Sequence, residues 1–152
     1  MKKHNKTTIC HEVQVHYKRP LFDEPKKVTS SESVVALLWE YIDPERLDYK
    51  EFFWLLLLNN SNTVIGMSEI GVGNTTAVAV NYKEVLQLAI LTNSVAIIVA
   101  HNHPSGALEP SKADRQLSEK LAEATKLLDI SLLDHVIVTS EGYYSFMDNG
   151  LL

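Results

Sequence analysis

The chain has 152 residues, of which 45% are hydrophobic, and a formal net charge of −5. This length and apolar content predict one globular domain with its own core, and no run approaches the roughly 20 apolar residues that a membrane-spanning helix needs. The only cysteine, Cys10, excludes an internal disulfide and a paired-cysteine metal site. The first residues lack the apolar segment of a signal peptide, so we expect a cytoplasmic protein without a membrane partner.

Charge is unevenly distributed along the sequence. Residues 1–27 contain seven Lys/Arg and three Asp/Glu, hence +4, which leaves −9 for the other 125 residues. An acidic body is a poor match for a phosphate backbone, so nucleic acid would associate only weakly or indirectly, through this basic arm or a partner.

In the arm, Val13, Val15 and Tyr17 alternate with polar residues and predict a half-buried strand, whose exposed edge would permit an oligomer. We therefore divide the chain into a basic arm with one strand, 1–27, and a domain, 28–152.

Helices and strands alternate in the first half of that domain. A helix is expected to begin after Ser30 or Ser31, either of which can cap it, and to end before Pro44. The apolar run 51–58 is too short for a surface helix and predicts a strand buried on both faces. Residues 63–72 are expected to return antiparallel to it.

The second half continues the alternation. It contains a helical stripe over 82–89, a strand over 95–100, an amphipathic helix from near Ser111, and closing strands over 131–139 and 143–147. This order predicts a mixed α/β domain with helices packed on a central sheet.

A polar segment follows the strand that ends near residue 100. Its letters HNHP contain His101 and His103, which point to the same side of an extended chain. If Ser111 caps the next helix, Asp114 lies in its first turn, near the same strand end. Two histidines and one carboxylate leave one open position on a tetrahedral zinc, as in catalytic sites. Alternatively, Ser111 and Asp114 form only a capping box, and the histidines are ordinary loop residues.

HNH, seven further residues beginning with Pro104, a serine, two more residues and an aspartate resemble the JAMM motif of the JAB/MPN metalloprotease superfamily. The segments HNHPSG, PSKAD and LLDHVIV are most similar to its RadC branch, and the similarity extends from about Ile9 to Leu152. The resemblance implies a single JAB/MPN-like domain of cytidine-deaminase-like architecture, with a mixed central sheet flanked by helices. RadC-like proteins generally carry a helix-hairpin-helix segment before this domain. We expect this chain to be a short form without it, which weakens a DNA-repair role.

The resemblance also implies roles for individual residues. The superfamily's ligands for one zinc per chain match His101, His103 and Asp114, and Ser111 matches the serine that stabilises the developing oxyanion. An upstream glutamate of the family precedes Phe-x-x-Leu-Leu, and Glu51, in EFFWLLLL, fits that pattern. Glu69 is the competing candidate, but it falls inside the second predicted strand. Glu51 would act as base and then acid while a zinc-activated water cleaves a peptide or isopeptide bond.

Three functions remain open on these grounds: a zinc peptidase acting on a protein or peptide, a non-catalytic MPN-type binding module, and a DNA-repair-associated accessory factor. Retention of the ligand residues argues against the second, and the acidic body against the third. The letters H-N-H also suggest a nuclease, but Asn102 should face away from the metal. His135 lies among apolar neighbours and is expected to be a buried, hydrogen-bonded histidine rather than a fourth ligand.

Overall fold

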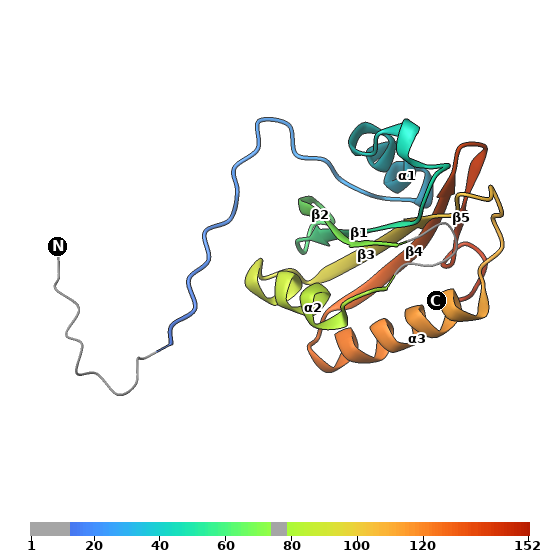
Figure 1. Ribbon diagram of the computed structural model, residues 1–152. Coiled ribbons are helices and arrows are strands. Elements are labelled where there is room, and N and C mark those ends of the chain that lie inside the picture. Colours follow the sequence, from blue (N-terminus) through green and yellow to red (C-terminus); the bar gives the residue numbers. More distant parts are fainter. Residues whose placement is uncertain (1–12, 74–78) are drawn as a thin grey trace, which may run out of the picture.

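A computed structural model describes residues 13–73 and 79–152 (Figure 1). In these ranges the helices and strands are α1 (Ser31–Tyr41), η1 (Pro44–Arg46, a 3-10 turn), β1 (Phe52–Leu58), β2 (Val64–Val72), α2 (Tyr82–Leu91), β3 (Ala96–Asn102), α3 (Lys112–Leu127), β4 (Ser131–Thr139) and β5 (Gly142–Ser145). The strands form one sheet in the order β2-β1-β3-β4-β5. Only β3 and β4 are parallel, so the sheet is mixed, as predicted. None of the helices described is long and apolar enough to cross a membrane.

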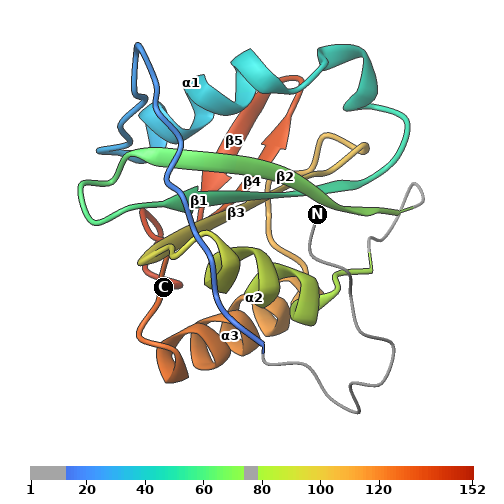
Figure 2. The ribbon, with the colours of Figure 1, turned by 90° about the vertical axis from the view of Figure 1, so that its left-hand side faces the viewer.

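Helices cover both faces of the sheet. Figure 2 shows α1 on one face and α2 with α3 on the other. All seven residues of β1 are buried because successive side chains enter different layers. Trp54 and Leu56 pack in the α1 layer, whereas Phe53 and Leu55 pack in the layer of α2 and α3. Burying one such side chain contributes about 1.5–3 kcal/mol, so the strand predicted from its continuous apolar run anchors both layers.

The helices begin where short polar side chains can cap them. Ser30 accepts a hydrogen bond from the backbone N–H of Ser33, and the Ser33 hydroxyl accepts one from the backbone N–H of Ser30. The helix α1 ends at Tyr41, three residues before Pro44, as predicted. Asn81 caps α2 by accepting from the N–H of Glu84.

The strand predicted around Val13 to Tyr17 is wrong. Residues 13–26 contain no helix or strand, and Val13 and Val15 are 92% and 86% exposed. An alternating pattern makes one face of a strand apolar, but a strand also needs a neighbouring backbone to pair with. From residue 13 onward, antiparallel contact begins at Lys27, which bridges Thr63. Cys10 and the first residues of the arm lie outside the described residues.

The connection between β3 and α3 fixes where the polar segment lies. Because β3 and β4 are parallel, the chain must cross over between them, and α3 makes that crossover on one face of the sheet. The turn after β3 includes Gly106 at φ +81°, a left-handed conformation that favours glycine, and its N–H donates to the carbonyl of His103. The first turn of α3 therefore returns to the carboxyl end of β3.

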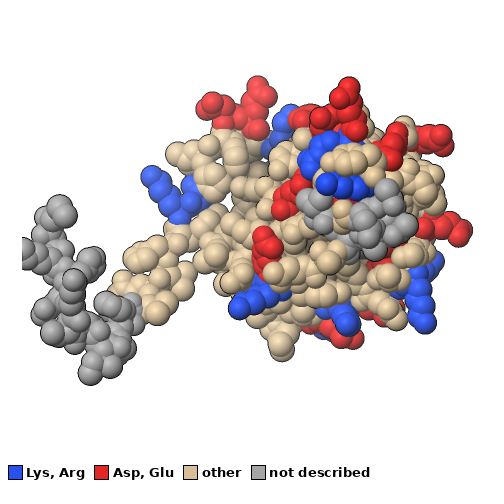
Figure 3. Space-filling view, viewed as in Figure 1, with Lys and Arg blue, Asp and Glu red and all other residues tan. Residues whose placement is uncertain are grey.

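Charged side chains of both signs are spread over the surface. On the face drawn in Figure 3, Lys and Arg lie scattered among Asp and Glu, and the described part of this face carries no continuous basic patch. This distribution agrees with the charge of −9 that the sequence assigns to residues 28–152.

Candidate metal centre

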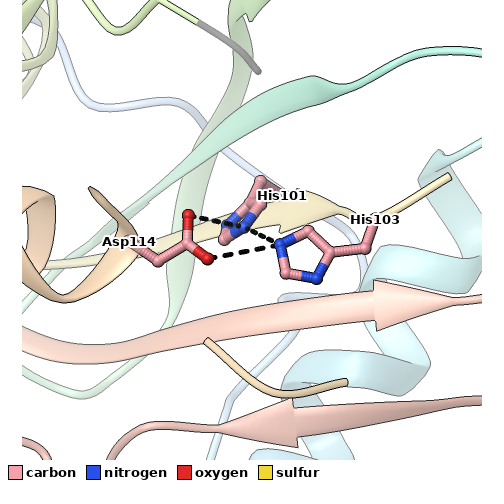
Figure 4. A group of neighbouring side chains, drawn as sticks. All are labelled: His101, His103 and Asp114. Carbon is pink, nitrogen blue, oxygen red and sulfur yellow. Dashed lines mark hydrogen bonds and ion pairs between the residues drawn. The ribbon is translucent and has the colours of Figure 1, made fainter. Parts of the chain in front are cut away.

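Three side chains converge at the carboxyl end of β3. His101 and His103 come from the strand and its continuation, and Asp114 comes from the first turn of α3 (Figure 4). The Nε2 atoms of the two histidines lie 2.9 Å apart. The carboxylate oxygens of Asp114 lie 3.2 Å from Nε2 of His101 and 3.3 Å from Nε2 of His103. The predicted same-side projection of the two histidines and their proximity to Asp114 are therefore confirmed.

The distances between these atoms suit a tetrahedral cation. With metal–nitrogen bonds of about 2.0–2.1 Å, neighbouring ligand atoms around tetrahedral zinc are about 3.3 Å apart. The two nitrogens are 2.9 Å apart, His101 Nε2 lies 3.2 Å from Oδ1 and His103 Nε2 lies 3.3 Å from Oδ2 of Asp114, and one donor atom of each residue lies within 4.8 Å of the other two. Two facing imidazole nitrogens can share only one proton, whereas a cation between them would accept both lone pairs. His101, His103 and Asp114 thus form a candidate metal site whose donor types fit zinc.

A backbone contact orients His103. Its Nδ1 lies 2.6 Å from the carbonyl oxygen of Ala107, and since a carbonyl only accepts, Nδ1 carries the proton and Nε2 faces the cluster. The hydrogen bond to Asp114 raises the pKa of His103 above its ordinary value. Burial opposes this shift, and the Ala107 carbonyl and the charge of Glu51 add to it. The negative charge around His103 thus favours a cation at Nε2.

Asp114 belongs to the capping box and to the cluster at once. Its N–H donates to the Ser111 hydroxyl at 3.1 Å, and its Oδ2 accepts from the Ser111 N–H at 2.7 Å. Burial works against ionisation of Asp114, but hydrogen bonds from His101 and His103 outweigh it and hold its pKa below the usual range. The two interpretations of Ser111 and Asp114 are therefore compatible, because the cap aims the carboxylate at the histidines.

Glu51 lies beside the cluster. It is 8% exposed and directly precedes β1, which pairs with β3 so that Phe53 faces His101. If this antiparallel register is extended by two residues, Glu51 lies opposite His103. This position agrees with the charge of Glu51, which raises the pKa of His103.

Glu69, the competing candidate, lies on the other face of the sheet. It pairs with Trp54, whose side chain packs in the α1 layer, and accepts a hydrogen bond from the indole N–H. Both terminal nitrogens of Arg46 also donate to its carboxylate, at 2.9 and 3.0 Å. Of the two glutamates, the structure brings only Glu51 to the histidines.

Asn102 faces away from the cluster, as predicted. Its side-chain oxygen accepts from the N–H of Phe52 at 2.7 Å, and its amide donates to the carbonyls of Leu47 and Lys50 at 2.7 and 2.9 Å. The nuclease interpretation of H-N-H therefore fails on geometry. Asn102 instead ties the segment that leads into Glu51 to the end of β3.

A deeper contact of His101 was not foreseen from the sequence. Its Nδ1 lies 2.7 Å from Nε2 of His135 in β4, and Nδ1 of His135 contacts the hydroxyl of Ser118 in α3. His135 is fully buried, and burial lowers its pKa well below the ordinary value, so the ring is neutral at pH 7. The prediction of a buried, hydrogen-bonded histidine is confirmed. The available signal was that a histidine inside an apolar strand needs a polar partner.

Comparisons with known proteins agree with this geometry. A family profile described as RadC-like JAB domain matches residues 28–151. The chain is 40% identical over 126 residues to a UPF0758 protein of Flavobacterium johnsoniae, covering 83% of this chain and 54% of the relative. UPF0758 proteins of Pelodictyon phaeoclathratiforme and Thermotoga maritima are 37% and 38% identical over 139 and 128 residues, covering 91% and 84% of this chain and 60% and 56% of each relative. The chain thus spans little more than half the length of these relatives. It belongs to the family of RadC-like JAB domains.

Proposed function

We propose that this chain is a zinc-dependent hydrolase that cleaves a peptide or isopeptide bond. The observation that carries the proposal is the convergence of two imidazole Nε2 atoms and one carboxylate at the end of β3, with Glu51 beside them. JAB domains form a superfamily that includes metallohydrolases. When bound, zinc would supply an activated water near neutral pH and polarise the scissile carbonyl.

Each residue of the site then has its own chemical role. His101, His103 and Asp114 would hold the metal. Glu51, buried next to His103, takes a proton from the attacking water and delivers it to the leaving amine. The exposed Ser111 accepts a hydrogen bond from the Asp114 N–H, so its own proton can be donated to the oxyanion of the substrate.

Metal content tests the first part of the proposal. We expect about one zinc per chain by elemental analysis of protein purified without added zinc or a polyhistidine tag. The variants His103→Ala and Asp114→Ala should both lose it. Little metal in the parent chain even after zinc is offered, with both variants unchanged, would overturn the proposal.

Hydrolysis of peptide and isopeptide substrates tests the second part. We expect Glu51→Gln to keep its zinc and to lose turnover by about 100-fold or more, as for removal of a general acid–base group. Glu69→Gln is the matched control, because it neutralises a glutamate on the opposite face, and it should keep both zinc and turnover. Equal turnover of Glu51→Gln and the parent would contradict the role of Glu51 and leave the metal site standing.

A further inference from the structure

We propose that His135 and Ser118 are positioning residues that set the tautomer and the orientation of the metal ligand His101. This inference rests on the metal-binding part of the proposed function and is independent of the bond that is cleaved. It concerns side chains beneath the site, away from substrate.

The three side chains form one buried chain of contacts. His135 pairs with Val99 across the parallel ladder, one alternation below His101, on the face that α3 covers. His101, His135 and Ser118 are 2%, 0% and 1% exposed. From the cluster inward, the contacts run from His101 Nδ1 to His135 Nε2 at 2.7 Å, and from His135 Nδ1 to the hydroxyl of Ser118.

Aromatic packing holds the His135 ring in this position. Phe146 stacks on it with ring centroids 4.4 Å apart and an interplanar angle of 22°. Phe53 meets it edge-on at 6.1 Å and stacks on His101 at 6.3 Å. Because protein interiors are close-packed, neither imidazole can turn without displacing a phenylalanine.

The proton positions along this chain follow from the metal ligand. His101 presents Nε2 to the cluster, so that nitrogen must carry a lone pair and Nδ1 must carry the proton. The Nδ1–H donates to Nε2 of His135, which leaves the proton of His135 on Nδ1, where it donates to Ser118. The opposite tautomer of His135 would donate to His101 Nδ1 and move the His101 proton onto Nε2, where it would block the metal.

The choice of histidine as partner affects the charge of the site. Metal-binding histidines usually donate to a carboxylate, a carbonyl or water. A neutral imidazole orients His101 without adding negative charge, so Asp114 is the only anionic ligand in the candidate site. The cation would keep more of its positive charge, which favours activation of a water.

Zinc affinity measured by competition with a chelator at fixed pH tests the inference. His135→Leu removes the acceptor and should weaken zinc binding by about 10- to 100-fold. His135→Gln, whose side-chain oxygen can accept from His101, should restore most of the affinity. Ser118→Ala should weaken binding less than His135→Leu does. Thr125→Val removes another buried hydroxyl from α3, one that bonds to the Leu121 carbonyl, and should leave affinity unchanged.

The tautomers can also be read without a variant. Long-range ¹H–¹⁵N spectra of the zinc-loaded parent chain should show the proton on Nδ1 of both His101 and His135. A proton on Nε2 of His135 would overturn the inference even if His135→Leu failed to fold. An unchanged zinc affinity in a folded His135→Leu variant would also overturn the inference.

These outcomes separate this inference from the proposed function. A parent chain that binds no zinc would contradict both. Zinc binding with the expected losses, but without hydrolysis of any peptide or isopeptide substrate, would support the positioning role and contradict the hydrolase.

Discussion

Asn102 stands between the two histidines in sequence and on the opposite side of the strand in space. It is fully buried and supplies partners for the N–H of Phe52, the first residue of β1, and for two carbonyls of the segment before it. A buried polar group left without a partner costs about 1–3 kcal/mol, so this one side chain holds the loop that leads to Glu51.

We predict that Asn102→Leu, which keeps the volume and removes the hydrogen bonds, lowers the free energy of unfolding by about 3 kcal/mol or more. Urea unfolding would measure this loss. The exposed Asn60 provides the control, because Asn60→Leu should change stability by less than about 0.5 kcal/mol. Equal stability of Asn102→Leu and the parent would show that the amide does not hold the loop.

Ser111 combines a structural and a proposed catalytic role, and two substitutions separate them. Loss of a serine N-cap to alanine costs about 1 kcal/mol, whereas glycine costs only a few tenths. We therefore predict that Ser111→Gly unfolds almost like the parent while Ser111→Ala is about 1 kcal/mol less stable. If the hydroxyl stabilises the oxyanion, both variants should lose hydrolysis alike. A Ser111→Gly variant with parental turnover would show that Ser111 acts only as a helix cap.

At the scale of elements, β4 carries a buried carboxyl group whose ionisation makes the stability of the fold depend on pH. Asp134 accepts hydrogen bonds from the backbone N–H groups of His135 and Met147 and from the Ser145 hydroxyl, and so ties β4 to the chain that follows β5. Burial raises the pKa of Asp134 above its ordinary value despite these bonds, and the neighbouring charge of Asp148 adds to the shift.

This raised pKa means that the folded chain holds the Asp134 proton more tightly than the unfolded chain does. The stabilisation is complete below the ordinary aspartate pKa of about 3.9 and is lost as pH rises through the raised value. We predict that Asp134→Asn, which is neutral throughout and can donate to Ser145, gains stability relative to the parent as pH rises from about 4 to 7. Urea unfolding with a chelator present would measure the difference. A difference that is constant with pH would contradict the shift.

The elements and the residues of the candidate metal site were largely predictable from the sequence, while their relations in space were not. The capped helix starts and the apolar run of β1 are local patterns, so they could be assigned correctly. The choice between Glu51 and Glu69 depended on which face of the sheet each occupies, and the contact of His135 with His101 depended on the parallel pairing of β3 with β4. Neither is encoded within one segment. The arm strand failed for the same reason, since it required a partner that no local pattern specifies.

At the scale of the molecule, charge separates the basic arm from an acidic domain. Acidic and basic side chains are mixed on the described face in Figure 3, and residues 28–152 carry a net −9. A nucleic-acid role would therefore rest on residues 1–27. We predict that any DNA binding is weak, falls steeply with salt, and is lost when all seven Lys and Arg of residues 1–27 are changed to Gln. Filter binding at two salt concentrations would measure it, and salt-dependent binding retained by that variant would place the contact on the domain.

The candidate metal site joins two elements that otherwise meet through packing and the crossover loop. His101 and His103 belong to the end of β3 and Asp114 to α3, so a bound cation would cross-link the sheet to the helix. A ligand that binds only the folded state stabilises it by about 2.7 kcal/mol at 100 times its dissociation constant. For a domain of this size we predict a rise in Tm of about 5 to 11 °C when zinc is returned to protein that a chelator has stripped of metal. Thermal unfolding of His103→Ala should show no rise, because two remaining ligands bind weakly. An equal rise in that variant would place the stabilising zinc elsewhere, whereas a rise confined to the parent would link the folding of α3 onto β3 to occupancy of the site.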